Sequence, residues 1–377
     1  MRKDTIGFCY LKTGAGHACG AFSLKEKIST LYPDARSVMY NPFEEGAFLS
    51  SLFFEKGYFV TSNYLSLLYI LFYRITSHFA VLNFGRFAYR SFFLSRFVRF
   101  LRKEKITKVV CVHEILIPHL REAIEIVNPS IELITIVMDP FTCHPLWFYE
   151  RNTRLIVFSE KLRNEAIEKY NFDATCVHTF PIMLSEKFDL PYSEEEKQKV
   201  REELGIPKGK KVVLIAGGGE GLRNATSLVF FFLKRKVDCY VVVVCGRNKK
   251  LKNMLSAMVA HYQGENVRLF GFVSCMPALM NIADCVISKS GPATVMEALS
   301  IGKPLILCSY VRPQEFGNKC YVKLNNVGWY IPNSLDAVKK AEEIVSCTSD
   351  EIARNIKSLN IRNGLEDIAH FIMSEKR

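Results

Sequence analysis

Short apolar runs rich in Val, Ile and Leu alternate with longer amphipathic stretches in the second half of the chain. Buried parallel strands read as continuous apolar runs, and amphipathic periodicity indicates helices, so this alternation predicts a doubly wound α/β domain. The expected strands are Lys211–Ala216, Cys239–Cys245, Val267–Phe270, Cys285–Ile287 and Pro304–Cys308. The expected helices are near Arg223–Lys234, Lys249–His261, Met276–Ile282, Pro292–Ser300 and Phe316–Leu324. Ligands of such sheets bind beyond the carboxyl ends of the strands.

The first half opens with the same kind of unit. An apolar run at Thr5–Leu11 predicts a strand, a glycine-rich turn follows it, and a helical pattern covers Ala18–Leu31. Continuous β-branched runs at Lys108–Val112 and Glu132–Val137 predict further strands. Their character suits a parallel sheet that is covered on both faces.

The length of 377 residues is more than one typical core holds, which suggests two domains. The composition changes near Pro181–Lys210, and charge rises sharply at Ser193–Lys199. This pattern is typical of an inter-domain linker followed by a short helix. We therefore expect one doubly wound α/β domain at 1–183 and a second at 184–377. The last helix is a candidate to pack back onto the first domain.

The formal net charge of +12 favours an anionic partner such as nucleic acid, anionic lipid or a phosphate-bearing ligand. Much of this charge lies in residues 47–105, the basic aromatic block, which holds nine basic and two acidic residues. Nucleic-acid modules stack bases on aromatic rings beside cations, but none of their known signatures occurs here. A basic, strongly apolar face suits an anionic membrane surface. Ordinary core helices with a solvated basic face are the alternative.

The 12 cysteines are scattered without a CxxC pair, and no DxD motif occurs. Zinc and redox sites usually need close pairs of cysteines, so we interpret the cysteines as reduced core thiols. We expect neither a metal nor another cofactor. The stretch Met1–Gly16 does not read as a signal peptide, because Lys12 breaks its apolar run. The apolar core of Gly57–Tyr73 is too short for a membrane-spanning helix, so none is expected.

Two glycine-containing turns end predicted strands of the second half. Gly218 lies in the glycine run 217–221, whose backbone can approach a phosphate; the alternative is an ordinary tight turn. Arg247 follows the next strand. It is either a cation over the same edge of the sheet or a surface arginine.

The segment Ser288–Glu297 carries the strongest pattern. Pro292 suits the first turn of a helix, where a missing N–H costs nothing. Ser290 and Thr294 place hydroxyls beside free N–H groups at the positive helix end, which predicts a diphosphate seat. Glu297, one turn further, can accept both hydroxyls of a ribose. The alternative is a helix N-terminus whose Ser, Thr and Glu act only as caps.

In the first half, Gly16 and His17 close the first glycine-rich turn. A histidine whose pKa lies near neutrality suits the general base that a poorly nucleophilic hydroxyl needs. A helix-capping histidine is the alternative. His113 and Glu114 also end a predicted strand and are further candidates.

A second segment of the first half, Met138–Phe148, follows a buried strand. Asp139 could orient the candidate base or take part in catalysis itself. His144 and Trp147 could line a pocket. The alternative is a proline-rich loop with packed aromatic rings.

Together these motifs resemble the GT-B glycosyltransferases of the lipid-sugar group. The similarity is greatest to the monogalactosyldiacylglycerol synthases and processive diacylglycerol glucosyltransferases, and more distant to the lipid II-forming N-acetylglucosamine transferase. The residues that carry it are Gly14, Gly16 and His17, Met138–Phe148, Gly271–Val273, Asp284, Ser288–Thr294, Glu297, Ala298, Gly302–Pro304 and Pro313–Asn318.

The resemblance implies two Rossmann-like domains that face a crevice, with uracil at the backbone of Phe272 and Val273 and ribose at Glu297. It implies that the diphosphate lies at Ser290–Thr294 near Arg247. The residues that it assigns to the nucleotide sugar are Gly16, Gly218, Arg247, Phe272, Val273, Ser290, Gly291, Pro292, Ala293, Thr294, Glu297, Gln314, Glu315 and Asn318, the last three at the hexose. Catalysis is assigned to His17 and Asp139, and acceptor binding to His144 and Trp147.

The expected activity is inverting transfer of a hexose from a UDP-sugar to a diacylglycerol-type lipid. The expected place is the cytoplasmic side of a bacterial cell membrane, bound peripherally through 47–105, with no nucleic-acid partner. Ala293 and Arg312 stand where many relatives carry smaller residues, so glucose, galactose and N-acetylglucosamine stay open. The alternatives are N-acetylglucosamine transfer to a polyprenyl-linked acceptor, a soluble UDP-sugar epimerase of the same fold, and a membrane-bound nucleotide-sugar sensor.

Overall fold

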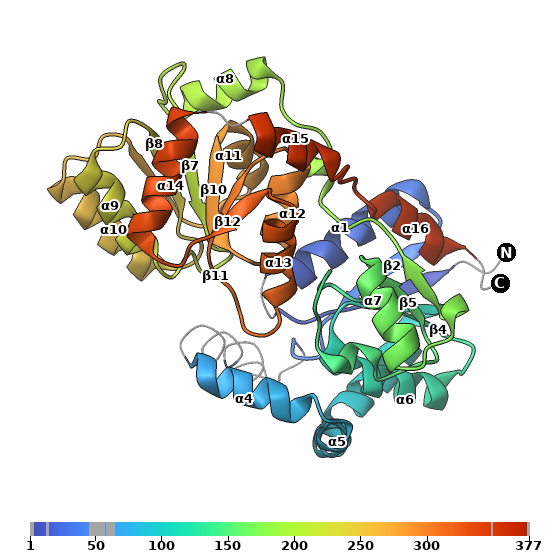
Figure 1. Ribbon diagram of the computed structural model, residues 1–377. Helices are drawn as coiled ribbons and strands as arrows, with labels where there is room; N and C mark the ends of the chain where they lie inside the picture. The colour runs from blue at the N-terminus through green and yellow to red at the C-terminus, as the bar shows by residue number, and fades with distance from the viewer. Residues whose placement is uncertain (1–3, 13–14, 45–56, 58–64, 348–349, 375–377) are drawn as a thin grey trace. The chain divides into compact units, whose positions relative to one another are not determined.

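The computed structural model describes residues 4–12, 15–44, 57, 65–347 and 350–374, and it divides into two compact units (Figure 1). The N-terminal unit comprises Met1–Glu186, Arg312–Gln314 and Asn363–Arg377. The C-terminal unit comprises Lys187–Val311 and Glu315–Arg362. The chain therefore returns to its first unit twice, once through a short loop and once through its last helix.

The N-terminal unit is built on a six-stranded parallel sheet with the order β2-β1-β3-β4-β5-β6. The strands are β1 (Thr5–Cys9), β2 (Arg36–Tyr40), β3 (Lys108–Cys111), β4 (Glu132–Ile136), β5 (Arg154–Val157) and β6 (Val177–Thr179). The three strands expected from the apolar runs are confirmed as β1, β3 and β4. The pattern missed β2 and β6, which are edge strands with polar residues, and the four-residue β5.

Alternate residues of these strands pack into two apolar layers, one on each face of the sheet. Ile6 and Phe8 of β1 contact the layer of α1 (Ala15–Leu31) and α16 (Leu365–Met373). Cys9 lies in the opposite layer with α5 (Phe79–Glu104) and α6 (Ile117–Val127). The other helical segments of this unit are α4 (Ser66–Thr76), η2 (Glu114–Leu116), η3 (Pro145–Phe148), α7 (Glu160–Asn164), η4 (Glu165–Lys169), η5 (Ala174–Cys176) and η6 (Glu186–Phe188), which ends just past the division.

The C-terminal unit has a second six-stranded parallel sheet, with the order β12-β11-β10-β7-β8-β9. Its strands are β7 (Val212–Ala216), β8 (Tyr240–Val244), β9 (Val267–Phe270), β10 (Cys285–Lys289), β11 (Leu305–Ser309) and β12 (Gly328–Tyr330). Its helices are α8 (Glu194–Glu203), α9 (Ala225–Arg235), α10 (Lys249–His261), α11 (Met276–Ile282), α12 (Pro292–Ser300), α13 (Phe316–Leu324), α14 (Ser334–Ser346) and α15 (Asp350–Ser358). The alternation read from the sequence is confirmed here, and the elements it missed are the short edge strand β12 and the helices α14 and α15.

The helix expected after the linker is α8, and its start has a local cause. The hydroxyl of Ser193 accepts a hydrogen bond from the Glu196 N–H, and the Glu196 carboxylate accepts one from the Ser193 N–H. This reciprocal capping box satisfies two of the amides that a helix leaves unpaired at its start.

The basic aromatic block separates into two kinds of helix. The second half of α5 is ordinary core, because Phe93, Phe97 and Leu101 are buried against the sheet and α6. The helix α4 instead exposes most of its apolar residues. Residues 47–56 and 58–64 of the block lie outside the described residues. Within the described part of the chain, no helix has both the length and the apolar character needed to cross a membrane.

All twelve cysteines are free, and six of them are buried. The expectation of core thiols is wrong for Cys19, Cys275 and Cys347, which are exposed on helix surfaces or helix ends.

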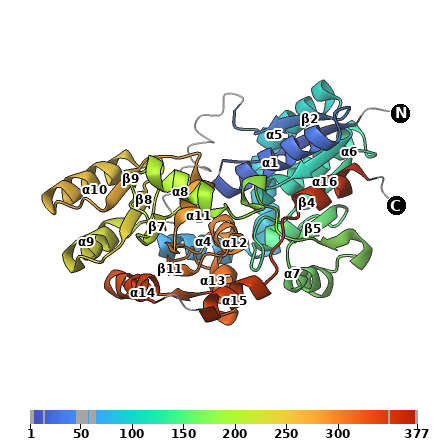
Figure 2. The same cartoon turned by 90° about the horizontal axis from the view of Figure 1, so that it is seen from above.

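The last helix, α16, is fastened to the N-terminal unit by its end as well as by its apolar face. Two buried cations satisfy its terminal carbonyl groups: Lys108 Nζ donates to the Ile372 oxygen at 2.9 Å, and Arg154 donates to the Phe371 oxygen at 2.7 Å. A positive charge at the carboxyl end of a helix is favourable because of the helix dipole. Figure 2 shows α16 beside α1, against which it packs.

We predict that Ile368→Ala destabilises the N-terminal unit by about 2–5 kcal/mol, because the Ile368 side chain is fully buried against α1 and the sheet. Each unit holds one of the chain's two tryptophans, Trp147 and Trp329, so a Trp329→Phe background reports N-terminal unfolding alone. Ile126→Ala, at a side chain that is about half exposed, is the control and should cost far less. Equal losses in urea unfolding for the two variants would contradict this role of α16.

Candidate active site

In the C-terminal unit, the start of α12 is held by its neighbours at the carboxyl edge of the sheet. The Ser290 N–H donates to the Ser309 oxygen at 2.9 Å, and the Ser290 oxygen accepts from the Asn318 amide at 2.8 Å. Gly291 is the N-cap and Pro292 opens the helix. Because the first-turn amides of a helix have no partner within it, Ala293 and Thr294 present N–H groups beyond this edge. Such an arrangement binds anions.

Two further side chains fix the loop that faces α12. The buried Glu315 carboxylate pairs with Lys289 and accepts from the Val311 N–H at 2.8 Å. Asn318 is also buried, and its amide reaches Ser290. The hydroxyl of Ser290 is buried without a hydrogen-bond partner among the described residues. Glu315 and Asn318, expected at the hexose, thus already support the expected diphosphate seat.

The turns after β7 and β8 pack closely against each other, and glycines in them allow this close approach. Gly218 has φ of +82°, and Gly246 has φ of +60°. A Cβ on Gly246 would lie 2.1 Å from the Gly219 oxygen, to which the Arg247 N–H donates at 2.7 Å. Side chains other than glycine therefore do not fit at Gly246. The Arg247 guanidinium lies 4.5 Å from the ring centroid of Phe272, which is 62% exposed. Val273 is half-buried beside it.

Glu297 is one turn into α12. Burial raises its pKa to about 7. No hydrogen bond or ion pair of its carboxylate occurs with any of the described residues. A carboxyl group in this state is able to accept hydrogen bonds from incoming hydroxyls, at the cost of losing a proton near neutral pH.

In the N-terminal unit, His17 lies in the first turn of α1, directly after β1. Its Nδ1 is 2.8 Å from the backbone oxygen of Val112, the residue that follows β3. A carbonyl oxygen only accepts, so Nδ1 carries the proton and the lone pair of neutral His17 is on Nε2. The ring stacks on Trp147, with centroids 6.2 Å apart, and lies 5.2 Å from the His113 ring. Burial and His113 lower the pKa of His17.

The other residues expected beside His17 have defined partners. Trp147 is fully buried beneath the His17 ring. His144 accepts from the Leu146 N–H through Nδ1 at 3.1 Å, and its Nε2 lies 3.2 Å from the Thr76 hydroxyl of α4. Burial lowers the pKa of His144. Contact of Trp147 and His144 with an acceptor stays a prediction.

Asp139 is buried at the carboxyl end of β4, where the Gln314 amide donates to its two carboxylate oxygens at 3.2 and 3.1 Å. The Gln314 oxygen in turn accepts from the Tyr69 hydroxyl at 3.0 Å. The Val112 oxygen orients the His17 ring, and the orienting role expected of Asp139 stays a prediction. The sequence offers one signal for this partner: Val112 ends an apolar strand next to β1.

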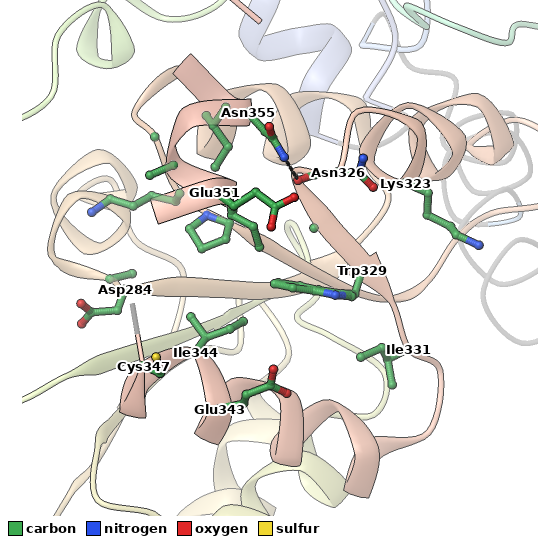
Figure 3. Close-up of a pocket in the computed structure, with 18 of the residues that line it drawn as sticks. Asp284, Lys323, Asn326, Trp329, Ile331, Glu343, Ile344, Cys347, Glu351 and Asn355 are labelled. Atoms are coloured by element: carbon green, nitrogen blue, oxygen red, sulfur yellow. Dashed lines mark hydrogen bonds between the residues drawn. The ribbon is translucent and has the colours of Figure 1, made fainter. Parts of the chain in front are cut away.

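A large cavity lies elsewhere in the C-terminal unit (Figure 3). It has a volume of about 730 Å³ and is lined by residues that precede or begin β10, β11 and β12, among them Asp284, Pro304 and Gly328. It is therefore at the amino edge of the sheet, away from Gly218, Ser290 and Glu297. No group of three or more His, Cys, Asp or Glu side chains that could hold a metal occurs in the described ranges.

The matches with known families follow the division of the chain into two units. Residues 17–182 match the family of monogalactosyldiacylglycerol (MGDG) synthase, and residues 212–365 match the glycosyltransferase family 28 C-terminal domain. The first half of the chain is thus similar to the MGDG synthase family. The second half carries the family 28 domain.

The MGDG synthase of Spinacia oleracea is 30% identical over 283 residues, which are 72% of this chain and 53% of that protein. The chain spans about half the length of the curated relatives it matches. A glycosyltransferase from Rickettsia africae superposes with a TM-score of 0.61 at 15% identity, over the whole of both chains. MurG of Acinetobacter baumannii superposes with a TM-score of 0.61 at 11% sequence identity, over 98% of this chain and 99% of the MurG chain. These structures show the GT-B fold.

We predict that the free energy of unfolding of the C-terminal unit falls as the pH rises from 4.5 to 7, because of Glu297. Its folded pKa is raised to about 7 from an ordinary 4.5, so the folded state keeps a proton that the unfolded state loses. In Glu297→Gln this loss is absent, and the variant gains up to about 3 kcal/mol over the parent between pH 5 and pH 8.

The measurement is urea unfolding read by Trp329 fluorescence in a Trp147→Phe background. Glu351→Gln, at an exposed glutamate of the same unit, is the matched control and should follow the parent at both pH values. A pH-independent difference between Glu297→Gln and the parent would disprove the buried, protonated state of Glu297.

Proposed function

We propose that this chain transfers a hexose from a UDP-sugar to the hydroxyl of a diacylglycerol-type lipid, with inversion at the anomeric carbon. The observation that carries the proposal is the match of residues 17–182 with the MGDG synthase family, which begins at His17. The family 28 domain at 212–365 supports a nucleotide-sugar site in the C-terminal unit.

The donor is proposed to bind along the carboxyl edge of the C-terminal sheet. The free amides of Ala293 and Thr294 and the positive end of α12 suit the diphosphate. Glu297 suits the ribose hydroxyls, and the exposed backbone near Phe272 and Val273 suits the uracil. Arg247, stacked on Phe272, is a mobile cation that can turn to the phosphates. Gly16 and Gly218 are proposed to allow close approach of the backbone.

The hexose is proposed to lie near Gln314, Glu315 and Asn318. Each of these side chains holds a protein partner in the structure: Asp139, Lys289 and the Ser290 oxygen, respectively. A hexose hydroxyl that binds Gln314 therefore competes with Asp139 or joins it in a shared network.

The transfer needs one proton to move. We propose that Nε2 of His17 takes the proton from the acceptor hydroxyl as its oxygen attacks the anomeric carbon. The bond from that carbon to the β-phosphate oxygen breaks, and the electron pair leaves with UDP at the helix N-terminus. The Val112 oxygen supports this role, because it holds Nδ1 as the donor and leaves Nε2 able to accept.

The lipid acceptor is proposed to reach the protein through α4. Its residues Leu67, Leu68, Leu71, Phe72 and Ile75 recur at helical spacing and are 83, 53, 55, 62 and 46% exposed. The opposite side of the helix is tied to the unit by Tyr69, which is buried, and by Thr76. An exposed apolar stripe together with the exposed Arg74 on the same helix suits an anionic lipid surface.

The direct test is incubation of the protein with diacylglycerol-containing vesicles and radiolabelled UDP-glucose, UDP-galactose or UDP-N-acetylglucosamine in parallel. The expected product is a labelled glycosyldiacylglycerol of β configuration at the new bond. Label that stays in the aqueous phase with all three donors would refute the proposal.

We predict that His17→Ala lowers kcat by at least about 100-fold, because the general base is lost, while KM for the donor stays within about twofold. The assay is the vesicle incubation above at saturating donor. His261→Ala changes an exposed histidine of α10 and should transfer at the parental rate. Parental kcat in His17→Ala would remove His17 from the mechanism.

We predict that Leu71→Ser combined with Phe72→Ser weakens binding to phosphatidylglycerol vesicles by at least about tenfold, because each side chain contributes about 1.5–3 kcal/mol when buried in lipid. The measurement is sedimentation with vesicles. Leu324→Ser is the control, since Leu324 is 82% exposed but belongs to α13 of the C-terminal unit. If Leu324→Ser weakens binding as much as the double variant, α4 is not the lipid-binding face.

A further inference from the structure

Three consecutive residues after β3, Val112–Glu114, surround His17 on one side. The Val112 oxygen accepts the hydrogen bond from Nδ1 of His17 at 2.8 Å. The ring of His113 lies 5.2 Å from the His17 ring, measured between centroids. Oε2 of Glu114 lies 3.4 Å from Nδ1 of His113. One short segment therefore orients the His17 ring, packs a second imidazole against it and places a carboxylate next to that second imidazole.

Glu114 is unusual among the acids of this unit. Its Oε2 is buried and has no hydrogen-bond partner, and none of the described lysines or arginines forms an ion pair with it. A carboxylate removed from water is costly unless a positive charge or a donor compensates it. The groups that feel its charge are titratable and largely uncharged ones: His17, His113, His144, Tyr73, Cys111 and Cys143. Of these groups, only the three histidines gain a positive charge by taking a proton, so one of them can offset the charge of Glu114.

Of the three histidines, His17 is the one whose second nitrogen is available. Nδ1 of His113 accepts from the Ile115 N–H at 3.4 Å, and Nδ1 of His144 accepts from the Leu146 N–H at 3.1 Å, so both act as caps of short helices. Their protonation at Nδ1 would break those caps. Nε2 of His17 has no hydrogen-bond partner within the described residues, and its protonation breaks no bond.

We propose that Glu114 is a positioning residue of the transfer reaction, whose carboxylate stabilises His17 while His17 holds the proton of the acceptor. This inference rests on the proposed function. As the acceptor oxygen bonds to the anomeric carbon and UDP departs, the proton moves from that oxygen to Nε2 of His17. The negative charge of Glu114 then offsets the positive charge formed on the imidazole, with the ring of His113 between the two groups. When the proton leaves to solvent or to UDP, the starting state returns.

The balance of charges around His17 agrees with this assignment. Burial and His113 lower the pKa of His17, whereas Glu114 and the hydrogen bond to Val112 raise it. Trp147, which stacks on the other face, carries no charge. His17 therefore starts as a neutral base, and Glu114 is the group that prevents it from becoming too weak a base to take a proton.

The test uses Glu114→Gln, which removes the charge and keeps the shape. We expect NMR titration of the ligand-free protein to show a lower pKa for His17 than in the parent. The acid limb of the kcat profile should move to lower pH by the same amount. At pH 8 kcat should fall by about tenfold or more, with KM for the donor within about twofold. A purely structural role would not move the acid limb.

Two further variants keep the test decisive. Glu114→Asp retains a carboxylate, so the pKa of His17 in this variant should lie between the values in the parent and in Glu114→Gln. Glu114→Asp also keeps the test possible if Glu114→Gln folds poorly. Glu125→Gln, at an exposed glutamate of α6 paired with Arg121, is the matched control and should leave His17 unchanged.

An unchanged His17 titration in Glu114→Gln overturns the inference, whatever the activity. A shifted titration in a protein that transfers no sugar from any UDP donor keeps the electrostatic link and overturns the proposed function. The two failures are thus separate. A shifted titration together with a displaced acid limb supports both.

Discussion

Parallel pairing of fully buried strands is the constraint on which both units depend. A buried strand must pair all of its backbone groups with its neighbours, and parallel pairing brings every carboxyl end to one edge of the sheet. In the N-terminal unit that edge collects His17 after β1, Val112 after β3 and Asp139 after β4. In the C-terminal unit it collects Arg247 after β8 and Ser290 after β10. Side chains far apart in sequence become neighbours for this reason alone.

The carboxyl edges of the two sheets present different chemical groups. The C-terminal unit presents backbone groups, namely glycines at positive φ, the start of α12 and the amides of Ala293 and Thr294. These groups suit a phosphate even though most of them carry no formal charge. The N-terminal unit offers titratable side chains, among which His113 lowers and Glu114 raises the pKa of His17. In the proposed reaction, anion binding is thus assigned to the C-terminal unit and proton transfer to the N-terminal unit.

In the proposed function, attachment to a membrane and organisation of the site share the helix α4. The outer side of α4 is apolar, whereas its inner side reaches His144 through Thr76 and Gln314 through Tyr69. The second half of α5 serves the core of the N-terminal unit, since it buries Phe93 and Phe97 against the sheet. The described part of the block therefore contains two different helices: α4 exposes an apolar side, and the second half of α5 packs in the core.

Periodicity in the sequence by itself determined the doubly wound class, most strands of the C-terminal sheet and the helix starts at Ser193 and Pro292, because burial and capping are local in their demands on residue type. The short strands β2, β5, β6 and β12 escaped it, since three to five residues with polar neighbours carry too little pattern. Motifs located His17 and Glu297 but not what surrounds them. Only the tertiary structure decided that Val112 orients His17, that Trp147 is buried beneath it and that Glu297 is desolvated. Those facts depend on strands brought together across a hundred residues, and on water excluded from the space between them, which no local pattern records.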